Sequence, residues 1–372
     1  MRTILLSALL LCQILLANAQ NAQNAHFPIA VWLQQTSNAK AYQEMGINTY
    51  VGLWNGLDAR QWEQLIAADM RLLVAQNDFA LSLGNHPMLC GWTLGDEPDN
   101  AQWNEREKRY DPCIEPEKII AQYNRIKEKD PSRPVYLNLG QGVSFTQWVG
   151  RGACTGNTSM YREYIKAADI VSYDIYPVNN NDTIVRGKLW YVAKGVDSLQ
   201  VWSNHQKPVW CWIETSKIGK DSPRKPTPTE VKTQVWMALI HGVKGFGYFC
   251  HSFLDVQDDA APLHDVEMRE GLTAINREVT ALAPALNAPT LPEYASVKVT
   301  PGAIPVDIMA KAYNGAHYLF AVAMRPGTCE ATFRVASGKE VEVIGENRNI
   351  KVNNNQFSDT FGSYGVRLYK IL

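Results

Sequence analysis

Eight short apolar runs, each followed by a longer stretch, constrain the fold of this chain more than any other feature. Most are rich in β-forming residues and apolar on both faces, which is typical of strands buried in a parallel sheet. They are Phe27–Leu33, Ile47–Leu53, Arg71–Asn77, Cys90–Glu97, Pro134–Leu139, Ile170–Tyr176, Pro208–Glu214 and Lys244–His251. Eight strands alternating with helices over about 250 residues match a (β/α)8 barrel, or TIM barrel. A doubly wound open sheet is the main alternative, but no GxGxxG turn follows the first run.

The segments between the runs predict amphipathic helices. Leu57–Met70 and Glu115–Lys129 carry apolar residues at helical spacing. Thr227-Pro228-Thr229-Glu230 reads as a capping box with proline in the first helical turn, and Gly242 is placed to end that helix. A further helix is expected over Leu263–Leu282, after the eighth run.

The character of the sequence changes after Ala283–Glu293, whose three prolines give it the composition of a linker. Seven short strand-like runs follow and predict a small antiparallel β-sandwich of roughly 80 residues. They are Val297–Thr300, Val306–Ala312, His317–Met324, Glu330–Val335, Glu340–Ile344, Asn349–Val352 and Val366–Ile371. We therefore expect a signal peptide over residues 1–19, a catalytic barrel over 20–288 and a β-sandwich over 289–372.

The first nineteen residues have the pattern of a secretory signal peptide. Met1-Arg2 precedes an apolar run from Ile4 to Ala17, and Ala17-Asn18-Ala19 is a small-x-small cleavage site. We expect cleavage after Ala19 and a secreted, periplasmic or extracellular protein. No later segment has 18 consecutive apolar residues, so no stable membrane insertion is expected.

The net charge and the cysteines indicate which ligands and cross-links to expect. The formal net charge of -1 gives no reason to expect nucleic acid as a partner. Cys113 and Cys154 lie in loop-like stretches and are the favoured disulfide pair, because export permits disulfides. Cys90, Cys211 and Cys250 lie in apolar runs and are expected to be small core residues. No CxxC or histidine-rich cluster suggests a metal site, and we expect no cofactor.

Two of the strand candidates end in a glutamate. The fourth run ends in Asp96-Glu97-Pro98, and the seventh ends in Ile213-Glu214-Thr215. Active sites of TIM barrels lie at the C-terminal ends of the strands, and glycoside hydrolysis needs two carboxyl groups there. A lone glutamate at a strand end is as well explained by a helix cap or an ion pair, but coincidence is a poorer account of both. The sequence therefore predicts Glu97 and Glu214 as the catalytic pair.

These motifs resemble clan A of the glycoside hydrolases, the retaining barrel enzymes with catalytic glutamates on strands four and seven. Glu97 matches the acid/base position, which is often followed by proline, and Glu214 matches the nucleophile position. The segment Thr227–Phe249 is similar to the region from helix seven to strand eight in the β-galactosidase-like members. The tail Ser358–Tyr369 looks like the last strands of sandwich modules appended to such barrels.

The chain departs from the clan pattern at two places. Asp96 stands where asparagine usually precedes the acid/base and bonds the sugar 2-hydroxyl, which brings a third carboxyl beside Glu97. Strand eight lacks the tryptophan often found there, so Phe249 or His251 would serve as the sugar platform.

Further polar and aromatic residues at the strand ends are candidates for substrate binding. The resemblance implies a tyrosine after strand six that orients the nucleophile. Tyr173 and Tyr176 both qualify, and Tyr176 is favoured because Pro177 marks the strand end. Asp174 is expected to face away from Tyr173 and to act as a cap or ion-pair partner. The predicted binding set is Trp32, Gln34, Trp54, Asn55, Trp92, Asp96, Asn138, Tyr173, Tyr176, Trp212, Phe249 and His251.

The favoured interpretation is a retaining glycoside hydrolase that cleaves β-glycosidic bonds in oligo- or polysaccharides by double displacement. Its expected partner is the carbohydrate substrate, while the sugar, the cleavage mode and the oligomeric state stay open. A non-catalytic carbohydrate-binding barrel on the cell surface is the main alternative. A structural export protein without a ligand is the third hypothesis, and it predicts no aromatic cleft at the strand ends.

Overall fold

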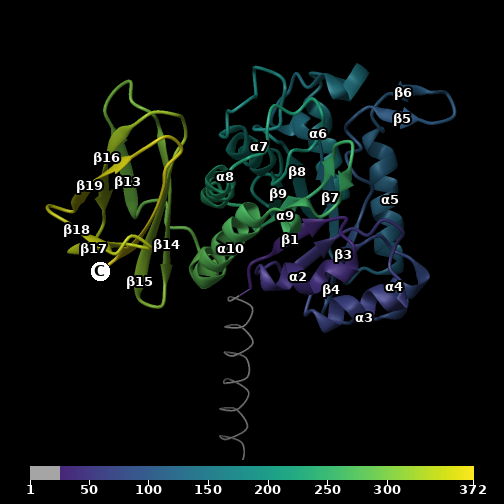
Figure 1. Cartoon of the computed structure of the whole chain (residues 1–372), viewed down its shortest axis with the longest axis horizontal. Coiled ribbons are helices and arrows are strands. Elements are labelled where there is room, and N and C mark those ends of the chain that lie inside the picture. The colour runs from purple at the N-terminus through teal and green to yellow at the C-terminus, as the bar shows by residue number, and fades with distance from the viewer. Residues whose placement is uncertain (1–25) are drawn as a thin grey trace, which may run out of the picture.

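A closed parallel barrel and a C-terminal β-sandwich make up the described part of the chain (Figure 1). The computed structural model describes residues 26–372, so the predicted signal peptide lies outside the described residues. The predicted fold class, a TIM barrel followed by an antiparallel β-sandwich, is confirmed. No helix within residues 26–372 is long and apolar enough to span a membrane.

All eight predicted runs form barrel strands, paired in the order β1-β10-β9-β8-β7-β4-β3-β2. The strands are β1 (Ile29–Trp32), β2 (Thr49–Val51), β3 (Arg71–Val74), β4 (Leu89–Thr93), β7 (Val135–Leu139), β8 (Ile170–Asp174), β9 (Val209–Glu214) and β10 (Gly245–Phe249). Alternate side chains such as Tyr136, Trp210 and Trp212 fill the barrel interior. The residues between them pack outward against the helices, which is why the runs are apolar on both faces.

Helices surround the barrel, and each of the four predicted helical segments corresponds to one of them. They are α2 (Ala39–Glu44), α3 (Ala59–Ala67), α4 (Asp78–Ser82), α5 (Pro116–Lys129), α6 (Ser159–Tyr164), α7 (Tyr191–Trp202), α8 (Pro228–Ile240), α9 (Ala261–His264) and α10 (Val266–Asn287). The capping box at the start of α8 is present, since Thr227 and Glu230 each accept a backbone hydrogen bond from the other. Helix α10 continues through Pro284 into the expected linker, because Ala283, Ala285 and Leu286 are buried there.

The C-terminal strands form two facing sheets. One has the order β13 (Ala295–Val299), β16 (Cys329–Val335), β19 (Gln356–Phe361). The other has the order β14 (Val306–Tyr313), β15 (Ala316–Ala323), β20 (Val366–Ile371), β17 (Glu340–Val343), β18 (Arg348–Lys351). The seven predicted strands are all present, and β19 was not among them, although the tail Ser358–Tyr369, which resembles the last strands of sandwich modules, overlaps it. That strand alternates two buried phenylalanines, Phe357 and Phe361, with polar residues, so its mean hydropathy is low.

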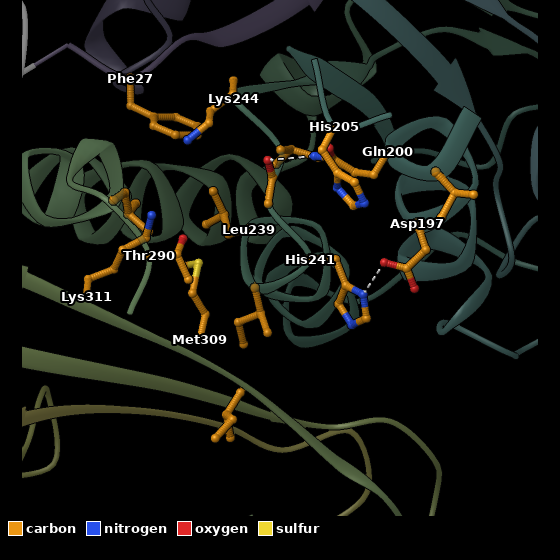
Figure 2. Close-up of a pocket in the computed structure, with 16 residues that line it drawn as sticks. Phe27, Asp197, Gln200, His205, Leu239, His241, Lys244, Thr290, Met309 and Lys311 are labelled. Carbon is orange, nitrogen blue, oxygen red and sulfur yellow. Dashed lines mark hydrogen bonds and ion pairs between the residues drawn. The ribbon is translucent and has the colours of Figure 1, made fainter. Parts of the chain in front are cut away.

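The sandwich packs on the barrel through α8 and α10. The Trp236 ring of α8 lies 5.2 Å from that of Phe320 in β15. At the end of α8, His241 bonds Asp197 of α7 through Nδ1 at 2.8 Å and Asp307 of β14 through Nε2 at 3.1 Å. Figure 2 shows His241 and Asp197 beside a cavity of about 450 Å³ between the two domains. One imidazole therefore joins a barrel helix to the sandwich.

Candidate active site

A cavity of about 320 Å³ opens at the C-terminal ends of the barrel strands, where TIM-barrel active sites lie. Its lining combines three carboxyl groups with several aromatic rings. The lining residues are Trp32, Leu33, Trp54, Asp96, Glu97, Asn138, Asp174, Tyr176, Trp212, Phe249, His251 and Phe253. Nine residues predicted for the site are therefore brought together in one cavity.

Asp96 and Glu97 reach the cavity because the chain turns sharply after β4. Glu97 has a φ of 41°, in the left-handed region that a residue with a side chain rarely adopts. Its amide donates to the Asn138 carbonyl at 3.2 Å, and its own carbonyl accepts from the Asn100 amide at 3.1 Å. Asn138 also donates through Nδ2 to Asp96 Oδ1 at 3.0 Å. These bonds hold two consecutive carboxyls in one cavity, although side chains on a regular strand would alternate between faces.

Asp174, at the end of β8, completes the carboxyl cluster. Its carboxyl group is in hydrogen-bond contact with that of Glu97, and Tyr176 Oη donates to its Oδ2 at 3.2 Å. The expectation that Asp174 is a cap or ion-pair partner is not what the structure shows. The residue lies on the same strand face as Ser172, whose hydroxyl bonds Asn138 inside the barrel. Strand alternation, counted from Ser172, was the signal that could have found it.

The cluster carries protons near neutral pH. Burial, followed by the charges of Asp174 and Asp96, raises the pKa of Glu97 well above its usual range. Burial and the charge of Asp96 raise the pKa of Asp174 to about 7, against a hydrogen bond from Glu97 that lowers it. Desolvation in the cavity raises the pKa of Asp96 to about 6. Glu97 is therefore the group that holds a proton, and Asp174 is the one that accepts its hydrogen bond.

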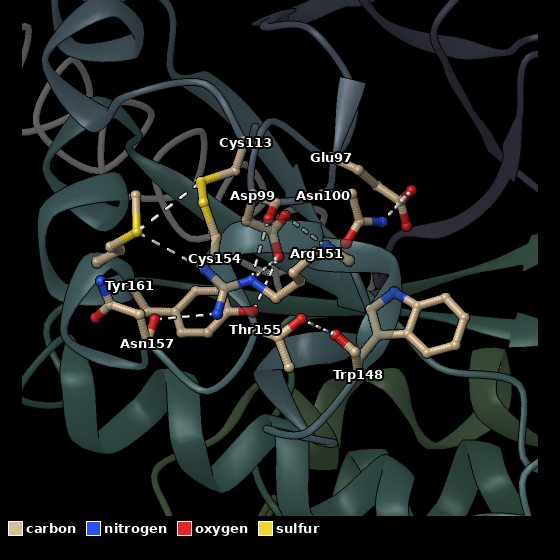
Figure 3. A network of polar contacts seen from close by, with 12 residues as sticks. Glu97, Asp99, Asn100, Cys113, Trp148, Arg151, Cys154, Thr155, Asn157 and Tyr161 are labelled. Carbon is tan, nitrogen blue, oxygen red and sulfur yellow. Dashed lines mark hydrogen bonds and ion pairs between the residues drawn. A yellow bond between two sulfur atoms is a disulfide. The ribbon is translucent and has the colours of Figure 1, made fainter. Parts of the chain in front are cut away.

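A buried network fixes the turn that carries Glu97 (Figure 3). Asn100 donates through Nδ2 to Glu97 Oε2 at 2.9 Å. Asp99 accepts from the Gly140 amide at 2.8 Å and from Tyr161 Oη at 2.9 Å, while Arg151 donates to the Asp99 carbonyl at 3.0 Å. Asp99 and Arg151 are fully buried, so each depends on the other for charge compensation.

The predicted Cys113–Cys154 disulfide is present and ties together the two loops around this network. Its Cα atoms are 6.2 Å apart. Cys154 ends the short helix that contains Arg151, and Cys113 lies between α5 and the hairpin of β5 (Gln102–Asn104) and β6 (Arg109–Asp111). The disulfide therefore restrains the loop after β4 and the loop after β7 at once.

Aromatic rings wall the cavity. The Trp32 and Trp212 rings meet edge to face at 5.0 Å, and Trp54 is 52% exposed at the mouth. Phe249 ends β10 and His251 lies two residues further on, with ring centroids 5.0 Å apart. Such faces suit the C–H surfaces of sugar rings, and the adjacent carboxyls suit sugar hydroxyls.

Glu214 does not line this cavity, although it ends β9 as predicted. It is fully buried and accepts hydrogen bonds from the Val178 amide at 2.8 Å, the Asn179 amide at 2.9 Å and Asn179 Nδ2 at 2.8 Å. Burial raises the pKa of Glu214 to about 7, although these three donors lower it. Its carboxylate is thus bonded to the loop after β8 and does not line the cavity that contains Glu97.

Four other predicted residues lie outside the cavity. Trp92 points to the helix side of the barrel, where Nε1 donates to Asp130 at 3.0 Å. Tyr173 is buried against α7 and donates to the Val192 carbonyl. Gln34 is buried and accepts from Tyr42 Oη at 2.5 Å, and Asn55 is exposed beside Trp54.

Besides Asp174, the cavity contains two residues that the sequence did not predict, Leu33 and Phe253. Leu33 directly follows β1 with a φ of 48°, so strand alternation does not predict its direction. Phe253 belongs to β11 (Ser252–Phe253), which pairs with β12 (Gln257–Asp258) in a small hairpin after β10. Its ring stacks on His251 with centroids 5.8 Å apart. Neither position carried a polar signal in the sequence.

The cavity at the junction of the barrel and the sandwich is a poorer candidate. The Asp197 and Asp307 carboxylates beside it are bonded to His241, and it lies at the opposite end of the barrel from Glu97. Within residues 26–372, no group of three histidine, cysteine or acidic side chains is arranged to hold a metal ion.

Comparison with models of known protein families and with curated protein sequences finds no match. Solved structures of glycosidases do match. A catalytic mutant of Gan42B, a GH42 β-galactosidase from G. stearothermophilus, superposes with a TM-score of 0.58 at 9% identity, covering 93% of this chain and 98% of that one. A putative α-galactosidase from Bacteroides fragilis gives a TM-score of 0.52 at 9% identity, covering 94% and 79%.

A family 51 α-L-arabinofuranosidase from Bifidobacterium longum gives a TM-score of 0.50 at 11% identity, covering 94% of this chain and 96% of that one. This chain has the fold of the TIM-barrel glycosidases. The predicted resemblance is confirmed at the level of the fold, and the function is argued from the site.

Proposed function

We propose that this protein is a glycoside hydrolase that cleaves β-glycosidic bonds in oligo- or polysaccharides with retention. The observation that supports this best is the Glu97–Asp174 carboxyl pair, set among aromatic rings at the C-terminal end of the barrel. A proton-bearing carboxyl beside an ionised one supplies the acid and the nucleophile that the reaction needs.

In the proposed reaction, Glu97 donates its proton to the glycosidic oxygen as the bond to the anomeric carbon breaks. The Asp174 carboxylate attacks that carbon and forms a glycosyl ester. Glu97, now ionised, then removes a proton from water, which displaces Asp174 and releases the sugar. Tyr176, bonded to Asp174 at 3.2 Å, orients the nucleophile in this scheme.

The choice of Asp174 differs from the sequence hypothesis, in which Glu214 is the nucleophile. Asp174 lines the cavity with Glu97, whereas Glu214 is buried and bonded to the loop after β8. Retaining pairs work at a carboxyl separation of about 5–5.5 Å. Because Glu97 and Asp174 are in direct contact, the scheme requires the arriving sugar to separate them.

We also propose that the mature protein acts outside the cytoplasm. The support is the signal-peptide pattern of residues 1–19, together with six cysteines in the rest of the chain, two of them paired. N-terminal sequencing of the exported protein tests this, with Gln20 expected as the first residue.

Hydrolysis of aryl β-glycosides tests the proposed activity. We expect at least one of the p-nitrophenyl β-galactoside, glucoside, mannoside and xyloside to be cleaved. Replacing Asp174 by asparagine should lower kcat by about a thousandfold or more, the scale expected for loss of a nucleophile. Replacing Glu97 by glutamine should cost about 100- to 10,000-fold on poor leaving groups. No cleavage of any substrate, natural oligosaccharides included, would leave the carbohydrate-binding alternative.

A further inference from the structure

A second cavity, of about 250 Å³, borders the first and shares the Tyr176 ring with it. It is built by loops after three consecutive barrel strands, β7, β8 and β9. Its lining includes Gln141 and Trp148 from the first loop, Asn179 and Asn180 from the second, and Ile218 from the third. The loops therefore form a second site at the same end of the barrel as the carboxyl pair.

The side chains that line this second cavity are suited to binding an uncharged sugar. The carboxamides of Gln141 and Asn180 offer both donors and acceptors, as hydroxyl groups require, while that of Asn179 is engaged with Glu214, Ser216 and Ile218. Trp148 and Tyr176 add aromatic faces. The lining cation Lys220 pairs with Asp255, and the other charged lining residue is the anion Asp221. No excess charge therefore selects an anionic ligand here.

Side-chain hydrogen bonds hold the three loops in place. Asn179 donates through Nδ2 to the Ser216 carbonyl at 2.9 Å and accepts from the Ile218 amide at 2.8 Å. Asn180 donates through Nδ2 to Gln141 Oε1 at 2.9 Å. A site held in this way loses little conformational freedom when a ligand binds.

Glu214 is the anchor of this arrangement. Its two carboxylate oxygens accept hydrogen bonds from the backbone amides of Val178 and Asn179, in the loop after β8. The residue is completely buried, so the bonds are shielded from solvent. Removing them takes away two backbone hydrogen bonds that restrain the segment carrying Asn179 and Asn180.

We propose that the second cavity is a subsite for a second, uncharged sugar unit, and that Glu214 is a positioning residue that builds it. This inference rests on the proposed function, because the first cavity takes the sugar whose bond is cleaved. The substrate is then a chain of at least two sugar units that spans Tyr176.

Chain-length dependence tests the subsite. For the sugar that the parent hydrolyses best, kcat/KM is compared between the p-nitrophenyl monoglycoside and neutral oligosaccharides of two, three and four units. We expect kcat/KM to rise tenfold or more from the shortest effective substrate to the tetrasaccharide. Replacing Trp148 by alanine should remove about tenfold of that gain, in line with the loss of one aromatic contact.

Trp103 supplies the matched control. It is a half-exposed tryptophan of the β5–β6 hairpin and lines neither cavity. Replacing it by alanine should leave the chain-length profile unchanged. Thermal unfolding of each variant, and the milder Trp148→Phe exchange, show whether an effect comes from misfolding.

Binding to the Glu97→Gln variant separates failure of this inference from failure of the proposed function. Calorimetry with the same tetrasaccharides should give an affinity about tenfold weaker when Trp148→Ala is added. If tetrasaccharides bind with this dependence but no glycoside is cleaved, the subsite stands and the hydrolase proposal fails. If glycosides are cleaved but neither kcat/KM nor binding depends on chain length or on Trp148, the subsite is overturned.

Discussion

Replacing Glu214 by glutamine separates its two possible roles, as catalytic nucleophile and as positioning residue, most sharply. The change removes one acceptor oxygen from a group that holds three donors, so at least one hydrogen bond is lost and the others lose their charge. That costs about 2–4 kcal/mol. The raised pKa of Glu214, about 7 against an ordinary value of 4.5, acts in the opposite direction. Keeping this buried group ionised costs about 3 kcal/mol, which the neutral amide avoids.

The net change in the free energy of unfolding near pH 7 should therefore stay within about 2 kcal/mol, or a few degrees in Tm. The sign of the pH dependence follows from the raised pKa. The stabilising contribution of a neutral Glu214 is complete below its unfolded pKa and is lost as pH rises through about 7. Between pH 5 and pH 8 the parent should therefore lose stability relative to the Glu214→Gln variant, so the Tm of the variant should rise relative to that of the parent. Glu128→Gln, at an exposed position on α5, is the matched control.

The kinetic result decides the role. If Glu214 anchors the loop after β8, kcat/KM for an aryl monoglycoside should fall less than about tenfold, and the oligosaccharide advantage should shrink. If Glu214 is the nucleophile, kcat should fall on the order of a thousandfold or more for every substrate. The second result, obtained with a folded variant, would refute the assignment of Asp174.

Three further predictions concern protonation and cross-linking. The pH profile of kcat/KM should be bell-shaped, with an acid limb near pH 7 set mainly by Asp174 and an alkaline limb above it set by Glu97; a flat profile from pH 5 to 9 would contradict this. Burial lowers the pKa of His241, but its two carboxylate partners outweigh this and raise the pKa to about 9. The contribution of His241 to folding stability is therefore complete below about pH 6.5 and is lost as the pH rises through 9. His241→Gln should therefore lower Tm at pH 6 by an amount equivalent to about 1–2 kcal/mol, after discounting for the partly exposed carboxylates, and by much less at pH 10. Replacing Cys113 and Cys154 by serine opens a loop of 41 residues and should lower the free energy of unfolding by about 4 kcal/mol. Activity, measured by hydrolysis, should also fall, and an unchanged Tm would contradict the role of the cross-link.

Most of the fold could be predicted because the barrel strands are buried on both sides. Runs such as Val209–Glu214 are apolar at almost every position, and only a parallel sheet covered by helices buries so many of them. Strand β19 could not be found in this way, because polar residues separate its two buried phenylalanines.

The candidate site was harder to predict than the fold because local backbone geometry decides where side chains point. Glu97 enters the cavity through a left-handed turn that no sequence pattern announces. Glu214 follows the inward-facing residues Trp210 and Trp212, yet its carboxylate is bonded to the loop after β8. The alternation of side chains along β8 could have predicted that Asp174 faces the cavity, but its role depends on contact with a carboxyl group that follows another strand.

The most direct test of the central claim is to trap the glycosyl-enzyme intermediate with a 2-deoxy-2-fluoro glycoside of the preferred sugar. Peptide mapping by mass spectrometry then identifies the labelled carboxyl group. The proposed mechanism predicts the label on Asp174, with no label in the Asp174→Asn variant. A label on Glu214 would contradict the assignment of the nucleophile, and rapid hydrolysis with inversion and no label would contradict the retaining mechanism.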